Sequence, residues 1–236
     1  MQLATALPSS PRSSVRRAAP FPASRRENRG LGDVRVLPRL FRAKEMVFLE
    51  GEPAEFAYRV VDGAVRLLRT TPDGRRQLVG FACPGDWLAV GAGESYSHTA
   101  EALVDSRLAP LSRAEYERRM REDRGFLSEM LATAARKLRQ AEEQMILLGQ
   151  RSALEKVASF LASFADRLGD EDEIRLPMDR TDIADYLGLT IETVSRKFTQ
   201  LKLAGIIALS TPSRVRICDA DALDRIASGD TSRRVH

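Results

Sequence analysis

Four polar side chains cluster at the start of an amphipathic stretch, LTIETVSRKFTQLKLAGII, which begins at Leu189. They are Glu192, Ser195, Arg196 and Lys197, which supply one carboxylate, one hydroxyl and two cations. Such a set suits nucleic acid, because an arginine can donate twice to guanine and a glutamate can accept from cytosine. A hydroxyl or an ammonium group can contact phosphate instead. This chemistry requires neighbouring elements that hold the four groups outward.

The residues around this stretch have the spacing of a helix-turn-helix, DRTDIADYLGLTIETVSRKFTQL. Apolar side chains at helical spacing can pack the two helices on each other; they are Ile183, Ala184, Leu187, Val194 and Phe198. The buried face of the second helix is expected to continue to Leu201 and Leu203. Gly188 lies at the turn, where a positive φ favours glycine. Thr190 can cap the second helix, so the polar end would face outward, as it does in a helix that reads the major groove.

A simpler interpretation of the polar cluster is a surface ion pair. Glu192 and Arg196 stand four residues apart and could pair on the helix with no binding role. The hairpin predicted after the helix carries Arg214 and Arg216, which could contact a DNA backbone. The turn glycine, the cap and this basic hairpin together favour DNA recognition over the simple pair.

Short strand-like segments fill residues 35 to 111. Segments such as YRVVDGAVRLLRT and RQLVGFACPGDWLAV are separated by turn signals at Gly51-Glu52-Pro53, Asp62-Gly63, Asp73-Gly74 and Pro84-Gly85-Asp86. Asp-Gly between apolar runs predicts a hairpin. Short strands at such regular intervals predict a β sandwich or barrel.

A long helix is predicted over residues 123–150, after a shorter one capped by Ser112 with Glu115 in a capping-box position. Its apolar residues follow each other in alternating steps of four and three: Leu127, Leu131, Ala134, Leu138, Ala141, Met145 and Leu148. This alternation places a seam against a partner helix, so the seam predicts a homodimer interface. The alternative is a helix that packs this face on its own domain.

The composition favours a cytoplasmic protein with substantial cores, since 43% of the residues are hydrophobic. No apolar run approaches the roughly 20 residues that span a bilayer, and no secretory signal is evident. The two cysteines, Cys83 and Cys218, lie far apart in the sequence. They fit a reducing compartment and give no support to a zinc or iron–sulfur site.

Residues 1–30 are rich in Ser, Pro, Ala and Arg, which predicts a disordered basic tail. The tail contains six arginines and one glutamate, whereas the whole chain has a net charge of +4. The remaining residues therefore carry a net charge of −1. Binding to DNA would have to use a local basic patch rather than an overall positive field.

Two segments resemble the CRP/FNR transcription regulators. GEPAEFAYRVVDGAVRLLRTTPDGRRQLVGFACPGDWLAV is similar to their β roll, and LPMDRTDIADYLGLTIETVSR to their helix-turn-helix. The resemblance covers residues 32–225, and the run E-T-V-S-R is close to the FNR and FixK branch. It implies an α+β fold with a cyclic-nucleotide-binding-like jelly-roll β sandwich, a long dimerisation helix and a C-terminal winged helix-turn-helix. The expected divisions are residues 1–30 for the tail, 31–122 for the β roll, 123–150 for the dimerisation helix and 151–236 for the DNA-binding domain.

The resemblance also implies partners. In the FNR and FixK branch, the positions that match Ile191, Glu192, Ser195 and Arg196 face a TTGAT-type half-site, so a homodimer would bind a palindrome in double-stranded DNA. RNA polymerase is an implied partner and a membrane is not, while activation and repression both stay open. The full set expected to contact DNA is Thr190, Ile191, Glu192, Ser195, Arg196, Lys197, Arg214 and Arg216.

The residues that CRP-type and FNR-type regulators need for sensing are missing from the matching parts of this sequence. CRP-type sensing needs a cation for the nucleotide phosphate, but residues 87–106 contain neither Arg nor Lys, which disfavours cAMP. FNR-type sensing needs an N-terminal cysteine cluster, and residues 1–82 contain no cysteine. No cofactor is therefore predicted, as in FixK-like members that work without one. The alternative is a regulator of the same fold gated by an unknown small molecule between the β roll and the long helix, by haem at His98, or by thiol redox at Cys83.

These side chains can also have a purely structural role, with His98 hydrogen-bonded, Cys83 buried as a small apolar group and Trp87 in the core. A jelly roll can also host a cupin-like metal enzyme, which needs several histidines and a glutamate around one metal. The β region has a single histidine, so no enzymatic activity is expected.

Overall fold

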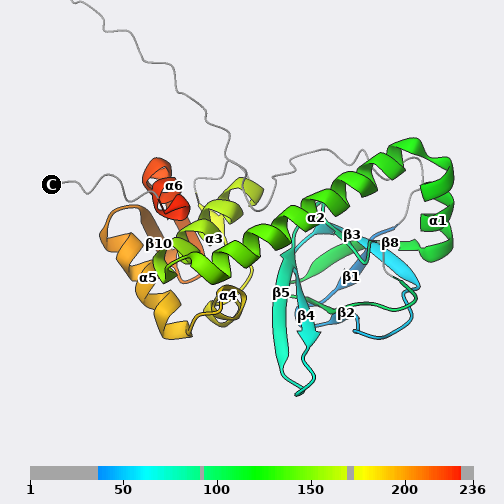
Figure 1. The fold of residues 1–236 in the computed structure, drawn as a ribbon, viewed down its shortest axis with the longest axis horizontal. Helices are drawn as coiled ribbons and strands as arrows, with labels where there is room; N and C mark the ends of the chain where they lie inside the picture. The colour runs from blue at the N-terminus through cyan, green and yellow to red at the C-terminus, as the bar shows by residue number, and fades with distance from the viewer. Residues whose placement is uncertain (1–36, 91–92, 169–172, 230–236) are drawn as a thin grey trace, which may run out of the picture.

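The computed structural model describes residues 37–90, 93–168 and 173–229, and the tail predicted for residues 1–30 lies outside them. Figure 1 shows a β roll at one end and a helical domain with a small sheet at the other. The long helix α2 (Arg124–Gln150) runs along both. This order of parts confirms the predicted α+β fold with an N-terminal β sandwich, a long helix and a C-terminal helix-turn-helix.

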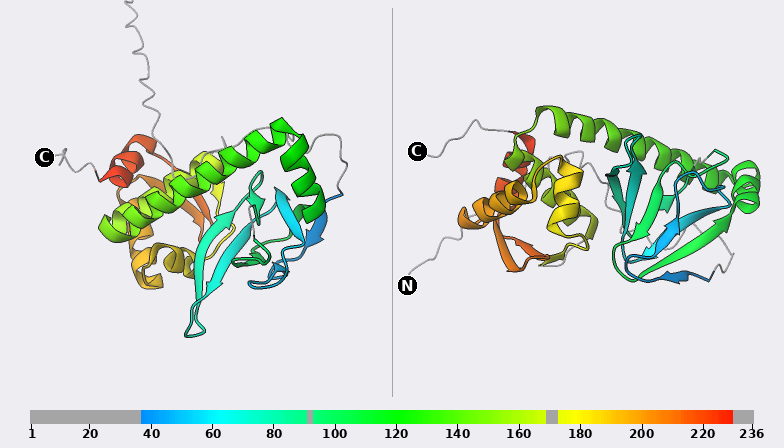
Figure 2. Two further views of the ribbon diagram at one scale, coloured as in Figure 1. Left: turned by 45° about the vertical axis from the view of Figure 1, so that its right-hand side comes forward. Right: turned by 90° about the horizontal axis from the view of Figure 1, so that it is seen from below.

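The β roll consists of two four-stranded antiparallel sheets packed face to face (Figure 2). In spatial order the first sheet contains β1 (Arg39–Phe41), β8 (Ser106–Ser112), β3 (Phe56–Asp62) and β6 (Trp87–Leu88). The second contains β2 (Met46–Phe48), β7 (Thr99–Ala102), β4 (Val65–Thr70) and β5 (Arg76–Ala82). Inward-facing residues of both sheets form one apolar core, which includes Phe41, Val60, Val65 and Leu108.

The two Asp-Gly turns in this region have different roles. Asp73-Gly74 joins β4 to β5 in the hairpin that the sequence predicts. The prediction is wrong at Asp62-Gly63, because β3 and β4 belong to different sheets and the chain crosses between them there. Gly63 has a φ of 91°, and a Cβ at this position would collide with Ser106, so the tight crossing requires glycine.

The remaining elements follow the β roll in a simple order. The helix α1 (Arg113–Glu122) is capped by Ser112, whose side chain accepts from the backbone of Glu115, as predicted. After α2 come α3 (Ala153–Leu168), β9 (Ile174–Arg175), α4 (Arg180–Leu187), α5 (Ile191–Leu203), β10 (Ile207–Thr211), β11 (Arg214–Ile217) and α6 (Ala220–Ser228). The three short strands pair as an antiparallel sheet in the order β10-β11-β9. Across the described ranges, every helix is too short or too polar to traverse a bilayer.

The N-terminal half of α2 is anchored on the β roll. Phe126 and Met130 are buried against Trp87 and Leu111. The indole Nε1 of Trp87 donates to a carboxylate oxygen of Glu129 at 3.0 Å. Trp87 is therefore a core residue, as expected, and it fixes the helix to the β roll.

A second apolar core joins the β roll to the C-terminal helices. Phe81 of β5 contacts the rings of Phe160, Phe164 and Tyr186, with centroids 6.4, 5.9 and 5.2 Å away. Leu68 and Leu78 of the β4–β5 hairpin belong to the same cluster. The C-terminal domain thus shares its core with the β roll and is held against it.

Phe81 is the side chain on which this joint depends most, so Phe81→Ala should lower the free energy of unfolding by about 3–5 kcal/mol. Denaturant unfolding followed by circular dichroism measures the change. Val79→Ala is the matched control, since Val79 lies on the same strand but is exposed. A loss in Phe81→Ala no larger than the control's would contradict a shared core.

Candidate nucleic-acid interface

The helix-turn-helix is built by two caps and one glycine. The side chain of Asp179 accepts from the backbone N–H of Asp182 at 2.9 Å and so caps α4. Gly188 ends α4 in the left-handed region, at φ 59° and ψ 44°, as predicted from its place in the turn. Thr190 then caps α5, because its Oγ1 accepts from the backbone N–H of Thr193 at 3.2 Å. The N-terminus of α5 thereby turns away from the domain.

The inner face of α5 packs on α4. Val194, Phe198 and Leu201 are fully buried, in one cluster with the α4 residues Ile183, Ala184 and Leu187. The prediction was wrong for Leu203, whose side chain is 83% exposed. Leu203 lies two positions beyond Leu201, about 200° further around the helix, and therefore points away from the core.

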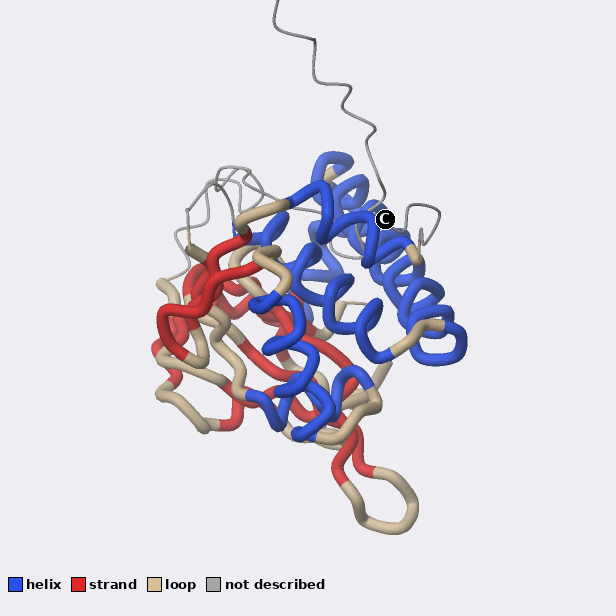
Figure 3. Tube along the Cα trace, turned by 90° about the vertical axis from the view of Figure 1, so that its left-hand side faces the viewer, coloured by secondary structure: helices blue, strands red, loops and turns tan. Residues whose placement is uncertain are grey.

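The outer face of α5 presents the polar cluster to solvent, at the end of the molecule that Figure 3 views. Glu192, Ser195 and Arg196 are exposed, as are Thr190 and Ile191. No ion pair joins Glu192 to Arg196 in the described part of the chain, although the charge of Arg196 acts on the Glu192 carboxylate through space. A hydrogen bond from its own backbone N–H lowers the pKa of Glu192, which keeps the carboxylate charged.

Lys197 and the two hairpin arginines differ in how they are engaged. The Lys197 Nζ donates to the side-chain oxygen of Gln200 at 3.0 Å. Arg214 forms an ion pair with Glu173 at 3.3 Å, a partner that the sequence alone did not indicate. Arg216 is exposed on the same face of β11, opposite the buried Val215. Lys197 thus lies on α5 itself and the two arginines on the hairpin after it, and Arg214 is partly neutralised.

Arg180 is a further cation beside α5 that the sequence reasoning missed. Its guanidinium carbon lies 3.2 Å from the centroid of the Phe198 ring, and its Nη2 donates to the Pro212 carbonyl at 2.9 Å. Burial lowers the pKa of Arg180 to about 10, which still leaves it charged at neutral pH. Its Nη1 has no hydrogen-bond partner. In the sequence, its position as the first residue of the first helix of the helix-turn-helix could have indicated a cation near α5.

The helix α2 has two apolar stripes. One is buried on the β roll and includes Phe126 and Met130. The other is the predicted seam, in which Leu131, Leu138 and Met145 are 61%, 62% and 67% exposed. Leu148, Ala134 and Ala141 are also exposed, and Leu127 is half-buried. Six of the seven seam residues are therefore exposed, although Ala141 also lines the cavity described below and Leu148 lies beside Gly188.

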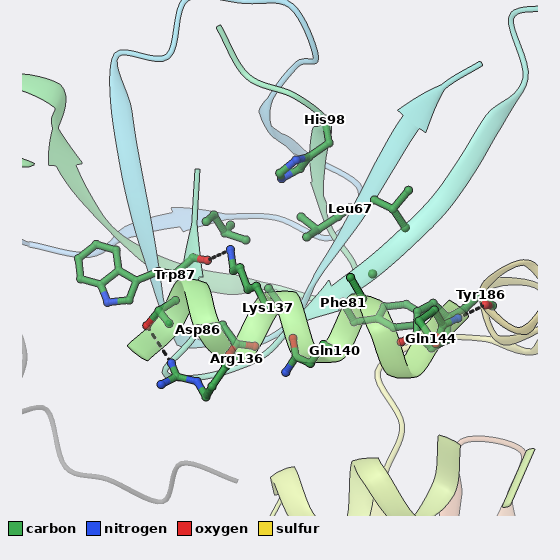
Figure 4. A pocket seen from close by; sticks show the side chains of 16 residues that line it. Leu67, Phe81, Asp86, Trp87, His98, Arg136, Lys137, Gln140, Gln144 and Tyr186 are labelled. Atoms are coloured by element: carbon green, nitrogen blue, oxygen red, sulfur yellow. Dashed lines mark hydrogen bonds between the residues drawn. The ribbon is translucent and has the colours of Figure 1, made fainter. Parts of the chain in front are cut away.

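A cavity of about 360 Å³ lies between the β roll and α2 (Figure 4). Residues 87–106 contain no cation, whereas the structure brings Arg136 and Lys137 to the cavity from α2. Both already have protein partners. The Lys137 Nζ donates to the Trp87 carbonyl at 2.8 Å, and the Arg136 Nη2 donates to the Thr133 hydroxyl at 2.8 Å.

His98 lines the same cavity. Its Nδ1 lies 3.1 Å from the Ser97 hydroxyl, while its Nε2 is buried without a hydrogen-bond partner. Burial, reinforced by the charge of Lys137, lowers the pKa of His98 to about 4. Among the residues that the structure describes, no three His, Cys, Asp or Glu side chains gather as a metal site. Cys83 is buried in the core shared with the C-terminal helices.

Comparison with known proteins matches both halves of the chain. A family model described as a cyclic nucleotide-binding domain matches residues 38–123, and one described as a Crp-like helix-turn-helix domain matches residues 155–226. The chain is 43% identical over 189 residues to the transcriptional activatory protein AadR of Rhodopseudomonas palustris, covering 78% of this chain and 79% of that protein. It is 44% identical over 173 residues to the nitrogen fixation regulation protein FixK of Bradyrhizobium diazoefficiens, covering 72% and 73%. Among solved structures, FixK2 from Bradyrhizobium japonicum has a TM-score of 0.76 and 39% identity, covering 80% of this chain and 96% of that one.

The depressed pKa of His98 predicts a pH-dependent loss of stability. The folded-state pKa of about 4 lies below the usual value of 6.5, so the unfolded chain binds the proton more readily. Stability from the neutral imidazole is complete above pH 6.5 and should be lost as the pH falls towards 4. NMR titration should show the His98 resonance, assigned with His98→Gln, moving only near pH 4. A midpoint near 6.5 would contradict burial of the neutral ring.

Proposed function

Because this chain belongs to the CRP/FNR family of DNA-binding transcriptional regulators, close to FixK, we propose that it binds a palindromic site with TTGAT-type half-sites as a homodimer. The observation that carries the proposal is the outer face of α5, where Arg196 and Glu192 are exposed without pairing to each other. This charged, outward-facing helix end presents a guanidinium that can donate to guanine and a carboxylate that can accept from cytosine.

The proposed contacts follow from the chemistry of each side chain. Arg196 donates twice to guanine, Glu192 accepts from the cytosine amino group, and Ser195 contacts a base or a phosphate. Thr190 and Ile191 adjoin the same groove. The phosphate contacts come from Lys197 on α5 and from Arg214 and Arg216 on the hairpin that follows it. Arg214 must exchange Glu173 for a phosphate.

The homodimer follows from the seam of α2. Six of its seven apolar residues at coiled-coil spacing are exposed, and a second copy of the same stripe is the natural complement. A two-fold axis along this seam would present two copies of α5 on one side. Adjacent major grooves on one face of DNA lie about 34 Å apart, which accounts for a palindromic site.

The proposed regulator is not an enzyme and acts on DNA in the cytoplasm without cAMP or an iron–sulfur cluster. A buried cyclic phosphate needs a cation from the β roll, and residues 87–106 contain neither Arg nor Lys. The cluster needs N-terminal cysteines, which residues 1–82 do not contain. By analogy with the relative named a transcriptional activatory protein, we propose that it activates transcription through RNA polymerase.

The cavity between the β roll and α2 favours a second mode of regulation. In this mode an unidentified small molecule occupies the cavity and gates DNA binding. Site selection with the purified protein, performed without additives, distinguishes the two modes. Recovery of a palindrome from random DNA supports effector-free binding, and recovery only after a cell extract is added supports gating. Failure under both conditions would contradict the proposed function.

The dimer interface can be tested with Leu138→Glu, which places two like charges in an apolar contact. We expect light scattering to show a monomer at micromolar concentration, together with loss of palindrome binding. Ala132→Glu is the matched control, because Ala132 is exposed on α2 outside the seam. A Leu138→Glu protein that remains dimeric would show that the seam is not the interface.

The proposed base contact can be tested with Arg196→Ala, which should cost roughly 1–3 kcal/mol per half-site and relax the preference at one base. Lys197→Ala should instead weaken binding to all sequences and reduce the salt slope by about one unit. Site selection at two salt concentrations separates these effects, with Lys202→Ala at the far end of α5 as the control. If Arg196→Ala weakens all sequences equally and the selected motif stays intact, Arg196 contacts phosphate and the assignment is wrong.

A further inference from the structure

One arginine of the β roll holds the helix-turn-helix. The Arg66 Nη1 on β4 donates to the Asp182 carboxylate on α4 at 2.6 Å. Its Nη2 donates to the Glu101 carboxylate on the neighbouring strand β7 at 2.8 Å. The guanidinium thus spans two carboxylates, one on each side of the boundary between the β roll and the DNA-binding domain.

Both carboxylates depend on this cation. Glu101 and Asp182 are only 4% and 6% exposed, and each forms its ion pair with Arg66. Burial raises the pKa of Asp182, and the bond to Arg66 opposes that shift. A buried carboxylate without its partner is strongly unfavourable. A movement of α4 that took Asp182 away from Arg66 would therefore be strongly unfavourable.

The hydrogen bonds of Arg66 define the angle of α4 more closely than the contacts around them do. The ring of Tyr186, on the same helix as Asp182, packs at a tilt against Phe81 of β5, and the Tyr186 carbonyl accepts a hydrogen bond of 2.9 Å from the Gln144 side chain of α2 (Figure 4). The apolar contact can tolerate sliding, whereas two charge-assisted hydrogen bonds to one planar guanidinium define an angle. Because α4 and α5 share one core, an angle set at Asp182 also sets the direction of α5.

We propose that Arg66 is a positioning residue for DNA recognition, which holds the helix-turn-helix at one angle on the β roll so that both recognition helices of a dimer reach adjacent major grooves together. The inference rests on the proposed homodimer and its palindromic site. Arg66 touches no base in this arrangement. It acts on the spacing and the angle between the two α5 helices.

The test uses the full-length chain and the variant Arg66→Met on three kinds of DNA duplex. These carry the selected palindrome, a single half-site, or the palindrome with one or two base pairs inserted at its centre. We expect half-site affinity within twofold of the unsubstituted protein and a loss of at least tenfold on the palindrome. We also expect the inserted base pairs to lower the affinity of the variant less than that of the unsubstituted protein, because a loosely held domain tolerates altered spacing.

Two controls separate positioning from folding. Arg69→Met removes an arginine of the same strand that pairs with Glu50 within the β roll, and should leave all three affinities unchanged. The triple variant Arg66→Met, Glu101→Gln, Asp182→Asn removes the bridge without leaving an unpaired buried charge. It should fold and still show the loss on the palindrome and the weaker spacing penalty.

The outcomes are distinct. If the unsubstituted protein binds the palindrome no better than a half-site, the proposed dimeric function fails, and the role of Arg66 fails with it. If the unsubstituted protein prefers the palindrome and the triple variant keeps the same affinity and spacing penalty, Arg66 is not a positioning residue. If the triple variant loses half-site binding to the same extent as palindrome binding, the bridge supports folding alone, which also overturns the proposal.

Discussion

The packing of Phe81 against Phe160, Phe164 and Tyr186 is the interaction on which the arrangement of this molecule depends. It merges the edge of the β roll with the core of the DNA-binding domain, so the two cannot turn independently without exposing aromatic surface. Burial of such large rings makes separation of the two parts costly. The angle comes from the polar contacts around the aromatic cluster, above all the bridge through Arg66.

Within the helix-turn-helix, too, apolar contacts hold the helices together and other residues set their direction. Apolar burial of Val194, Phe198 and Leu201 holds α5 in place, while Gly188 and the Thr190 cap set the direction in which it leaves the turn. The polar cluster can then remain exposed without destabilising the domain. Because the chain beyond the basic tail has little net charge, recognition must come from this local group and its flanking cations rather than from a general attraction to DNA.

Features that depend on neighbouring residues in the sequence were predictable, and those that depend on distant ones were not. The helical spacing of Ile183 and Val194, the turn at Gly188 and the exposed seam of α2 are properties of local periodicity. The Arg66–Asp182 bridge joins residues 116 positions apart, and no local pattern indicates it. The Arg214–Glu173 pair and the cavity cations Arg136 and Lys137 are long-range in the same sense. The Asp62-Gly63 turn was misread because a turn signal does not say whether the next strand stays in the same sheet.

In the proposed complex, the exposed end of α5 reads guanine in the major groove from both halves of a two-fold dimer. Methylation interference on the selected palindrome tests it most directly, because a methyl group on guanine N7 blocks the acceptor that a bidentate arginine requires. We expect methylation of one guanine in each half-site to abolish binding, with the two half-sites centred about 10 base pairs apart. Binding that is indifferent to N7 methylation, or sensitive in only one half-site, would contradict it.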